Sequence, residues 1–554
     1  MRKKNLSALF LALTIITSNA LTSCGETTTS TNEIVLNVYN SADYIKEDDT
    51  DTNEKGLITQ FEEYCLEEYN QKVRINYSTF DTNETMLSEL KTGKANYDLV
   101  CPSDYVIQKM IKEDMIEPFI EEDTPNYNQY VSPFVKEKMN GIEVNGQKNI
   151  VNQYARGYMW GTLGILYNSN YKALKNRNIT NEEMDEDMTS WSSLWDKKYN
   201  NLLAIKDSVR DTYAPGIFYT YNDDFTLNDK DYDGLKTLKE KYESKQIDAD
   251  TYNEKVTEIF NLCDDTTMNR VADNLVSLKE NAFGFEVDSG KTDMVKGDKF
   301  AINIAWSGDA AYAMDLADEY NESGTIEGEE VDKKDTSNAT DLKYVLPDTG
   351  ANIWFDGWVM PKGRGNNKIW AERFVDFLSM PTNAAQNMEY IGYTSVIAGD
   401  DVLSLVQSWY DVRYDEESET IDRETIKIDD PDFNDNYYTK DIGYFFDGTL
   451  EELSKEDTIF YLDIESKNKQ FDTQYPDSSI LPRLAIMADF GEQNASMLLM
   501  WESVKNTSLP LWSYILILVV VILIIAAVIF NYIRKAAVRK RRKERKLARE
   551  NKSK

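Results

Sequence analysis

The chain has 554 residues, of which 41% are hydrophobic, and this is enough to bury one large core or two medium-sized ones. Its 61 basic and 96 acidic residues give a formal net charge of −35, which repels nucleic acid and attracts cations, although acidity also serves solubility alone. The absence of histidine and of any CxxC pair excludes histidine-based catalysis, histidine zinc sites and a CxxC redox motif, so we expect no metal and no cofactor.

The N-terminus has the pattern of a bacterial signal peptide. A basic start is followed by a mostly apolar stretch over 6–16, which is too short to span a bilayer. The next motif, Leu-Thr-Ser-Cys over 21–24, resembles the bacterial lipobox, in which the cysteine becomes the lipidated first residue. We therefore predict a signal peptide over 1–23, lipidation at Cys24 and a Thr/Ser-rich tether over 24–33. The alternative is an ordinary cleavage site with an incidental cysteine.

The next part of the chain alternates between strand and helix patterns. Strands are predicted over 34–39, 73–77 and 97–101, and helices over 58–69 and 83–91. This order is typical of an α/β domain with a parallel sheet. Because ligands bind beyond the carboxyl ends of such strands, we expect residues 40–44 and 102–105 to face a binding crevice.

The middle of the chain is predicted to cross into a second domain and to return. Strands are predicted over 158–167, 202–205, 300–306 and 354–360, a charged helical stretch over 235–260, a polar loop over 326–341 and an amphipathic helix over 369–380. The strand over 354–360 leads back toward the first domain.

The C-terminus carries a second membrane signal. Residues 509–533 are nearly all apolar and long enough to cross a bilayer as a helix, with aromatic residues near both ends. The segment 534–554 holds twelve basic and two acidic residues, which indicates a cytoplasmic tail. We predict one transmembrane helix over 508–533, and we place the bulk of the chain on the extracytoplasmic face of the cell membrane.

Eight short segments follow one another in the outer part of the chain. They are 38–45, 77–86, 97–105, 190–195, 207–211, 305–308, 353–356 and 391–393. In this order they resemble the spermidine/putrescine-binding proteins of ABC importers, from about Ile34 to Lys505. The resemblance implies an α/β, two-lobed, hinged periplasmic-binding-protein fold that closes around a polyamine and docks on the permease subunits of an importer.

Each predicted lobe is assembled from two segments of the chain. Lobe 1 is assigned to 34–145 and 355–400, and lobe 2 to 146–354 and 401–507. The hinge is expected near 144–154 and Trp354, where the chain crosses between the lobes. The stretch 402–473 is longer than the family pattern, and no structure is predicted for it. The C-terminal helix also departs from that pattern, either as a second anchor or as a trace of fusion to a permease.

The resemblance also implies which side chains line the ligand site. They are Ser41, Asp43, Tyr44, Ser103, Tyr105, Asp207, Asp211, Trp306, Trp354, Asp356 and Tyr393. The primary-amine end of the ligand would rest on Trp354 and Asp356, with Asp211 opposite and Trp306 along the ligand. The chemistry agrees, because ammonium groups bind carboxylates and aromatic faces. The Trp-x-Asp spacing also places Trp354 and Asp356 on one face of a strand.

Three short sites in the chain, with four residues in all, differ from the family pattern and leave the preferred polyamine open. Ser41-Ala42 stands where Trp-Thr is frequent, and Met487 stands where some members have glutamine. Ser208 replaces an acidic residue, with Asp207 directly before it.

Other functions remain open from the sequence. A receptor for another cationic or neutral solute would keep the same fold, and an inert acidic adhesin would bind no small ligand. An enzyme without histidine could still be a glycosidase that uses Asp356 and Asp211 as its carboxylate pair. The segment 49–60 opens like a calcium loop, but it lacks the required glycine and glutamate.

Overall fold

The computed structural model describes residues 33–50, 52–93, 96–286, 289–297, 299–326, 329–330, 340–363, 367–428, 432–506, 519–520 and 522–523. The predicted signal peptide, Cys24, the basic tail and nearly all of the predicted transmembrane helix lie outside these residues. Among the residues that are described, no helix is long and apolar enough to cross a membrane.

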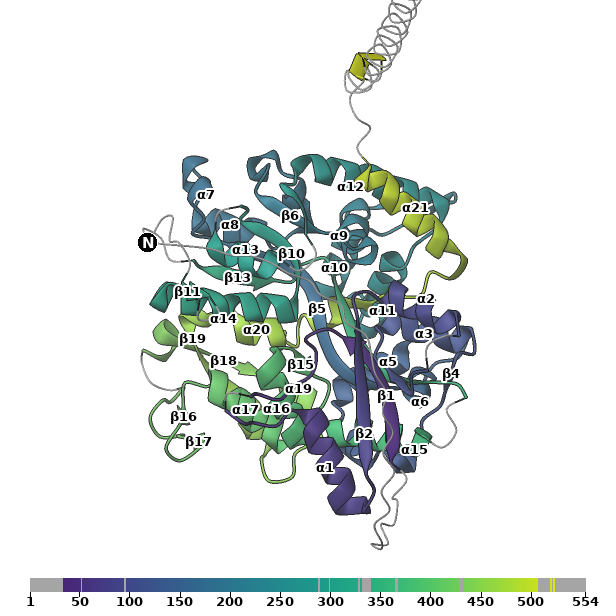
Figure 1. Ribbon diagram of the computed structural model, residues 1–554. Coiled ribbons are helices and arrows are strands. Elements are labelled where there is room, and N and C mark those ends of the chain that lie inside the picture. Colours follow the sequence, from purple (N-terminus) through teal and green to yellow (C-terminus); the bar gives the residue numbers. More distant parts are fainter. Residues whose placement is uncertain are drawn as a thin grey trace, which may run out of the picture.

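One mixed sheet runs through the molecule in the order β2-β1-β3-β14-β5-β10-β6-β9. The strands in this order are β1 (Ile34–Ser41), β2 (Val73–Phe80), β3 (Leu99–Val100), β5 (Ala155–Asn168), β6 (Leu203–Lys206), β9 (Gly284–Glu286), β10 (Ile302–Trp306) and β14 (Ala351–Pro361), and four shorter strands pair with β5 or β14 beside them. In the first half β1 pairs in parallel with β2 and β3, and in the second half β6 pairs in parallel with β9 and β10. The antiparallel strands β5 and β14 join the two halves, and Figure 1 shows β5 between them.

Strand β5 is long because its sequence suits burial on both faces. All fourteen of its residues are buried, as expected for a nearly continuous apolar run. Its glycines allow neighbouring rings to approach the backbone. A Cβ atom on Gly161 would lie 2.7 Å from the ring of Trp354, and one on Gly164 would lie 2.7 Å from the ring of Tyr344. The spacing of these glycines therefore fixes where aromatic side chains can lie against the sheet.

The helices predicted for the first half are confirmed. They are α1 (Leu57–Tyr69), α2 (Asn83–Lys91) and α15 (Lys368–Leu378). Helix α1 buries Phe61 and Cys65 at helical spacing, and the ring of Phe61 packs on Phe374 of α15 with centroids 5.0 Å apart. Helix α2 begins after Thr82, whose hydroxyl accepts a hydrogen bond from the amide of Thr85.

The charged stretch predicted over 235–260 is two helices rather than one. They are α10 (Leu235–Glu243) and α11 (Ala249–Phe260). The break falls at Lys245, which adopts a left-handed backbone conformation with φ of 59°. Asp248 then caps α11 by accepting a hydrogen bond from the amide of Thr251 at 2.8 Å. The loop predicted over 326–341 lies mostly outside the described residues.

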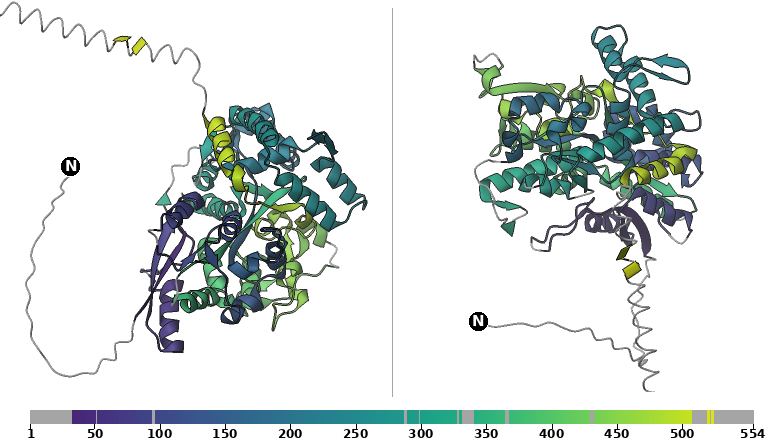
Figure 2. Two further views of the ribbon diagram at one scale, coloured as in Figure 1. Left: turned by 90° about the vertical axis from the view of Figure 1, so that its right-hand side faces the viewer. Right: turned by 90° about the horizontal axis from the view of Figure 1, so that it is seen from above.

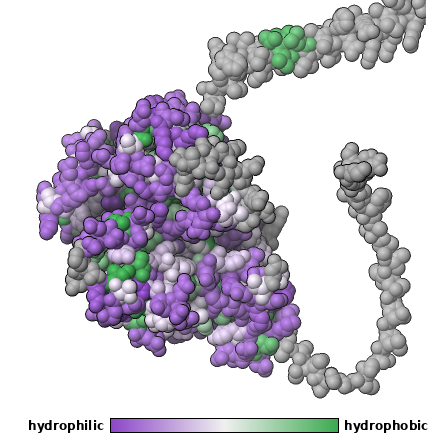
Figure 3. Space-filling model, turned by 90° about the vertical axis from the view of Figure 1, so that its left-hand side faces the viewer, coloured by the Kyte–Doolittle hydropathy of each residue, from purple (hydrophilic) through white to green (hydrophobic). Residues whose placement is uncertain are grey.

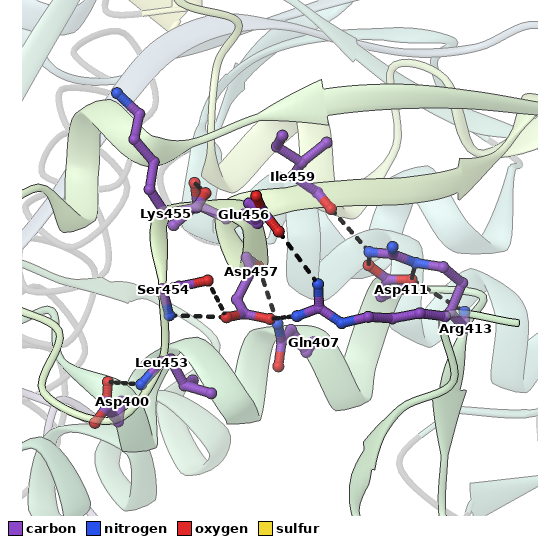
Figure 4. Close-up of polar contacts among 12 residues, drawn as sticks. Asp400, Gln407, Asp411, Arg413, Leu453, Ser454, Lys455, Glu456, Asp457 and Ile459 are labelled. Carbon is purple, nitrogen blue, oxygen red and sulfur yellow. Dashed lines mark hydrogen bonds and ion pairs between the residues drawn. The ribbon is translucent and has the colours of Figure 1, made fainter. Parts of the chain in front are cut away.

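The stretch that had no predicted structure, 402–473, is folded and held by polar contacts. Its main elements are α17 (Asp400–Tyr410), β18 (Tyr437–Asp441), α19 (Gly443–Phe446), β19 (Ile459–Asp463) and α20 (Gln470–Gln474). Figure 4 shows Arg413, whose guanidinium group donates to the carboxylate of Asp411 and to the carbonyl oxygen of Ile459, each at 2.8 Å. Gln407 donates to the carbonyl oxygen of Asp457 at 2.9 Å.

This stretch packs against both halves of the molecule. Helix α19 contacts α5 (Pro133–Gly141), and α20 contacts α14 (Ser307–Ser323). The ring of Phe445 stacks on Trp160 of β5, with centroids 5.7 Å apart. The inserted residues thus extend the core beside β5.

The last described helix of the body, α21 (Asn494–Lys505), packs against α12 (Asp265–Asn281) and α9 (Val209–Thr220) at the surface (Figure 2). The surface shown in Figure 3 is mostly hydrophilic, with small separate hydrophobic patches. This surface agrees with the excess of acidic over basic residues.

Candidate functional site

The segment that follows β3 reaches the middle of β14, where Asp356 lies. The pairing of β14 with β5 shifts register between Asp356 and Gly357, and Ser103 forms a bridge opposite Asp356. The hydroxyl of Tyr44 donates to Asp356 Oδ2 at 2.9 Å, and the Ser103 hydroxyl also bonds to this carboxyl group. Asn83 of α2 donates to Ser103 Oγ at 2.9 Å and thereby orients it. Three predicted site residues are therefore joined at one carboxyl group.

Two carboxyl groups lie at this point with raised pKa values, the half-buried Asp356 and the buried Asp104. Burial raises the pKa of Asp356 to about 6, and the charge of Asp211 adds to the shift against the hydrogen bonds from Ser103 and Tyr44. Asp104 is 1% exposed. Burial and the charge of Asp356 raise its pKa to about 8. The charge of Arg210 opposes the shift at Asp104 but does not cancel it, and a bound cation would favour the ionised form of Asp356.

Asp211 approaches from the second half of the molecule. It lies in the first turn of α9, where Ser208 caps the helix and accepts a hydrogen bond from the Asp211 amide at 3.4 Å. The indole nitrogen of Trp306 donates to Asp211 Oδ1 at 3.0 Å. Burial raises the pKa of Asp211, although the hydrogen bonds from Ser208 and Trp306 oppose this shift. Asp211 influences the pKa of Asp356, so the two carboxyl groups act on the same site from different halves.

Aromatic rings connect these carboxyl groups. The ring of Tyr393 packs edge to face on Tyr44, with centroids 5.5 Å apart. It also packs on Trp354 at a tilted angle, with centroids 6.0 Å apart. The absence of a side chain at Gly308 admits the Tyr393 ring, because a Cβ atom there would lie 2.4 Å from it. The Tyr393 hydroxyl donates to Asp309 Oδ1 at 2.8 Å. The site thus alternates aromatic faces with carboxyl groups.

The remaining predicted residues lie at the margin of this cluster. Tyr105 donates to Glu84 at 3.1 Å, and the guanidinium group of Arg210 lies 3.8 Å from its ring centroid. Asp43 is exposed, and the carboxylate of Asp207 contacts Lys505 at 3.0 Å. Ser41 ends β1 and is half-buried. The structure therefore does not direct the side chains of Asp43 and Asp207 toward Asp356.

A cavity of about 460 Å³ adjoins the cluster beside Tyr105. Helices α2 and α3 (Asp104–Lys112) line it from the first half, and α9 and α21 line it from the second. Glu84 and Arg210 are among its polar lining residues. The space between the halves is therefore open at Tyr105.

Several charged residues of the site were not predicted from the sequence. They are Glu84, Asp104, Lys206, Glu286 and Asp309. Four of them had a local signal, because Asp104 follows Ser103, Lys206 precedes Asp207, Asp309 lies three residues after Trp306, and Glu84 lies within the segment 77–86. Glu286 is brought in by the pairing of distant strands, for which the sequence carries no local signal.

A family model of bacterial extracellular solute-binding proteins matches residues 56–402, which is more than half of the chain. The chain belongs to this family. Members of the family are binding proteins rather than enzymes, so the prediction that the chain is not an enzyme is confirmed. The alternative of a glycosidase is thereby set aside.

The relatives of this solute-binding protein include named polyamine receptors. The spermidine/putrescine-binding periplasmic protein of Salmonella typhimurium is 26% identical over 371 residues, covering 67% of this chain and 80% of the relative. The putrescine-binding periplasmic protein PotF of Escherichia coli is 22% identical over 388 residues, covering 69% and 82%. The predicted resemblance to spermidine/putrescine-binding proteins is therefore confirmed.

A solved structure shows the fold independently. A protein of Listeria monocytogenes assigned to a spermidine/putrescine ABC transporter aligns with a TM-score of 0.51 at 22% identity, covering 85% of this chain and 98% of that one. The solute-binding protein thus has the predicted α/β periplasmic-binding-protein fold.

Proposed function

We propose that this solute-binding protein is an extracytoplasmic receptor for polyamines such as putrescine and spermidine, and that it delivers them to the permease of an ABC importer. The observation that carries the proposal is the pairing of Asp356 and Asp211 across a cluster of aromatic rings. Each carboxyl group is held by hydroxyl or indole donors, and the charge of Lys206 acts on Asp211 alone.

Ligand ammonium groups match this arrangement. A carboxylate–ammonium hydrogen bond is charge-assisted, and an ammonium over an indole ring gains about 0.5–2 kcal/mol. The methylene chain between the ammonium groups would lie along the rings of Trp354 and Tyr393. A few such contacts, after the cost of ordering the ligand, correspond to binding of roughly −8 kcal/mol, or micromolar affinity.

Membrane attachment is the second part of the proposal. We infer that a lipid on Cys24 and the helix over 509–533 hold the receptor beside its permease, where the effective concentration is high. The support is the sequence pattern at each end of the chain. Removing both features is expected to shift the protein from the membrane fraction to the soluble fraction.

A thermal denaturation screen tests the ligand class. A ligand present at about 100 times its Kd stabilises the native state by roughly 2.7 kcal/mol. We expect putrescine or spermidine to raise Tm, and glucose and glutamate to leave it unchanged at the same ionic strength. If a sugar or an amino acid raises Tm and no polyamine does, the polyamine proposal is wrong.

A further inference from the structure

The side chain of Lys206 places an ammonium group against Trp306 and Asp309, at the edge of the candidate site. Lys206 is the last residue of β6 and is 2% exposed. Its Nζ lies 3.1 Å from Glu286 Oε1 and 3.3 Å from Asp309 Oδ2. It also lies 4.4 Å from the ring centroid of Trp306. One protein ammonium therefore has two carboxylates and an indole face around it.

This environment is the one that a ligand ammonium requires. Two of the three partners of Lys206 also contact predicted ligand residues, because Asp309 accepts from Tyr393 and Trp306 donates to Asp211. Burial lowers the pKa of Lys206, but Asp309 and Glu286 outweigh burial, so that the pKa is raised. The group therefore remains charged at neutral pH.

We propose that Lys206 is an internal ammonium that occupies one cation subsite of the cleft, so that the receptor prefers diamines to triamines. This inference rests on the proposed polyamine function. A tethered ammonium is always present at its site, and a ligand ammonium would have to displace it and leave Lys206 buried without its partners. The carboxyl groups left for the ligand are those of Asp356 and Asp211, which suit two ammonium groups.

A purely structural role for Lys206 makes a different prediction. In that case the lysine only neutralises the carboxylates at the ends of β9 and α14, and its removal destabilises the protein without changing ligand preference. The ratio of spermidine affinity to putrescine affinity therefore separates the ligand-mimicking role of Lys206 from the structural one. A general loss of stability does not favour one ligand over the other.

The test is calorimetric titration of the full chain in mild detergent with putrescine and spermidine. The variant combines Lys206→Met with Glu286→Gln, which removes one positive and one negative charge and leaves Asp309 free to bind a ligand ammonium. We expect spermidine affinity relative to putrescine to rise by about tenfold or more, as for one added charge-assisted hydrogen bond. Lys206→Arg keeps the cation and is expected to keep the wild-type ratio.

An unchanged ratio in a double variant that still binds putrescine would overturn the inference and leave the polyamine function intact. The wild-type titration decides the matter even if the double variant does not fold, because tighter binding of spermidine than of putrescine contradicts the inference. If the folded wild-type protein binds neither polyamine, the proposed function fails, and this inference fails with it.

Discussion

The carboxyl groups of the buried Asp104 and the half-buried Asp356 act on each other at the candidate site, so their ionisation is linked to ligand binding. An ammonium group favours the ionised form of Asp356, whereas burial in the ligand-free site shifts the equilibrium toward the protonated form. The sequence could indicate Asp356 through its Trp-x-Asp spacing and the family resemblance. It could not indicate the raised pKa, because that depends on burial by Tyr44 and other distant residues.

Polyamine affinity is expected to fall with acid. Burial raises the pKa of Asp356 to about 6, above the ordinary 3.8. Because the ligand needs the ionised form of Asp356, affinity should fall by up to about tenfold per pH unit below pH 6. Calorimetry near pH 6 in buffers of different ionisation enthalpy should detect proton release. An equal Kd at pH 7.5 and pH 5 would contradict this linkage.

Asp104→Asn is expected to stabilise the ligand-free protein at high pH. The folded-state pKa of Asp104, about 8, lies above the unfolded value of 3.8. The stability contributed by the protonated group is therefore complete below pH 4 and is lost as the pH rises toward 8. The neutral amide avoids this loss, so the variant should gain roughly 1–3 kcal/mol at pH 8 and little at pH 4. Urea unfolding at both pH values measures this, and an equal effect at the two pH values would refute the linkage.

At the scale of elements, local patterns predicted most strands and helices of the body, whereas long-range pairing could not be predicted. The apolar run of β5 and the helical spacing of α1 and α15 are local signals. The order β14-β5-β10 and the folding of 402–473 depend on contacts between segments far apart in the chain. The stretch 235–260 divides into two helices because Lys245 adopts a left-handed backbone conformation. The spacing of apolar residues does not reveal the conformation of a single residue.

Gly161→Ala tests whether β5 positions the aromatic part of the site. The added Cβ atom would lie 2.7 Å from the Trp354 ring and 2.5 Å from Ser307 Oγ, so both side chains must move. We expect a stability loss of about 1–3 kcal/mol together with roughly tenfold weaker polyamine binding. Gly141→Ala is the matched control, since a Cβ atom there meets no heavy atom within 4 Å. Wild-type affinity in Gly161→Ala would show that Trp354 is not a ligand contact.

For the whole molecule, the two halves meet through β5 and β14, and the proposed site draws side chains from both. A ligand bonded to Asp356 in one half and Asp211 in the other stabilises their approach. The first chain segment of each predicted lobe could be assigned from local patterns. The place of 401–473 beside both halves of the molecule is set by packing against α5 and α14.

Ligand-driven closure is expected to make the body more compact. Small-angle X-ray scattering should show a smaller radius of gyration with saturating putrescine than without it. Asp211→Asn weakens the link between the halves and should reduce the change. No decrease under conditions where calorimetry shows saturation would contradict closure.

Calorimetric titration of the full chain with putrescine and spermidine at pH 7.5, in wild type, Asp356→Asn and Asp273→Asn, tests the central claim most directly. Asp273 is an exposed residue of α12 and serves as the matched control. We predict saturable one-to-one binding that is at least about tenfold weaker in Asp356→Asn and unchanged in Asp273→Asn. Absence of binding in folded wild-type protein, or equal affinity in Asp356→Asn, would contradict the account.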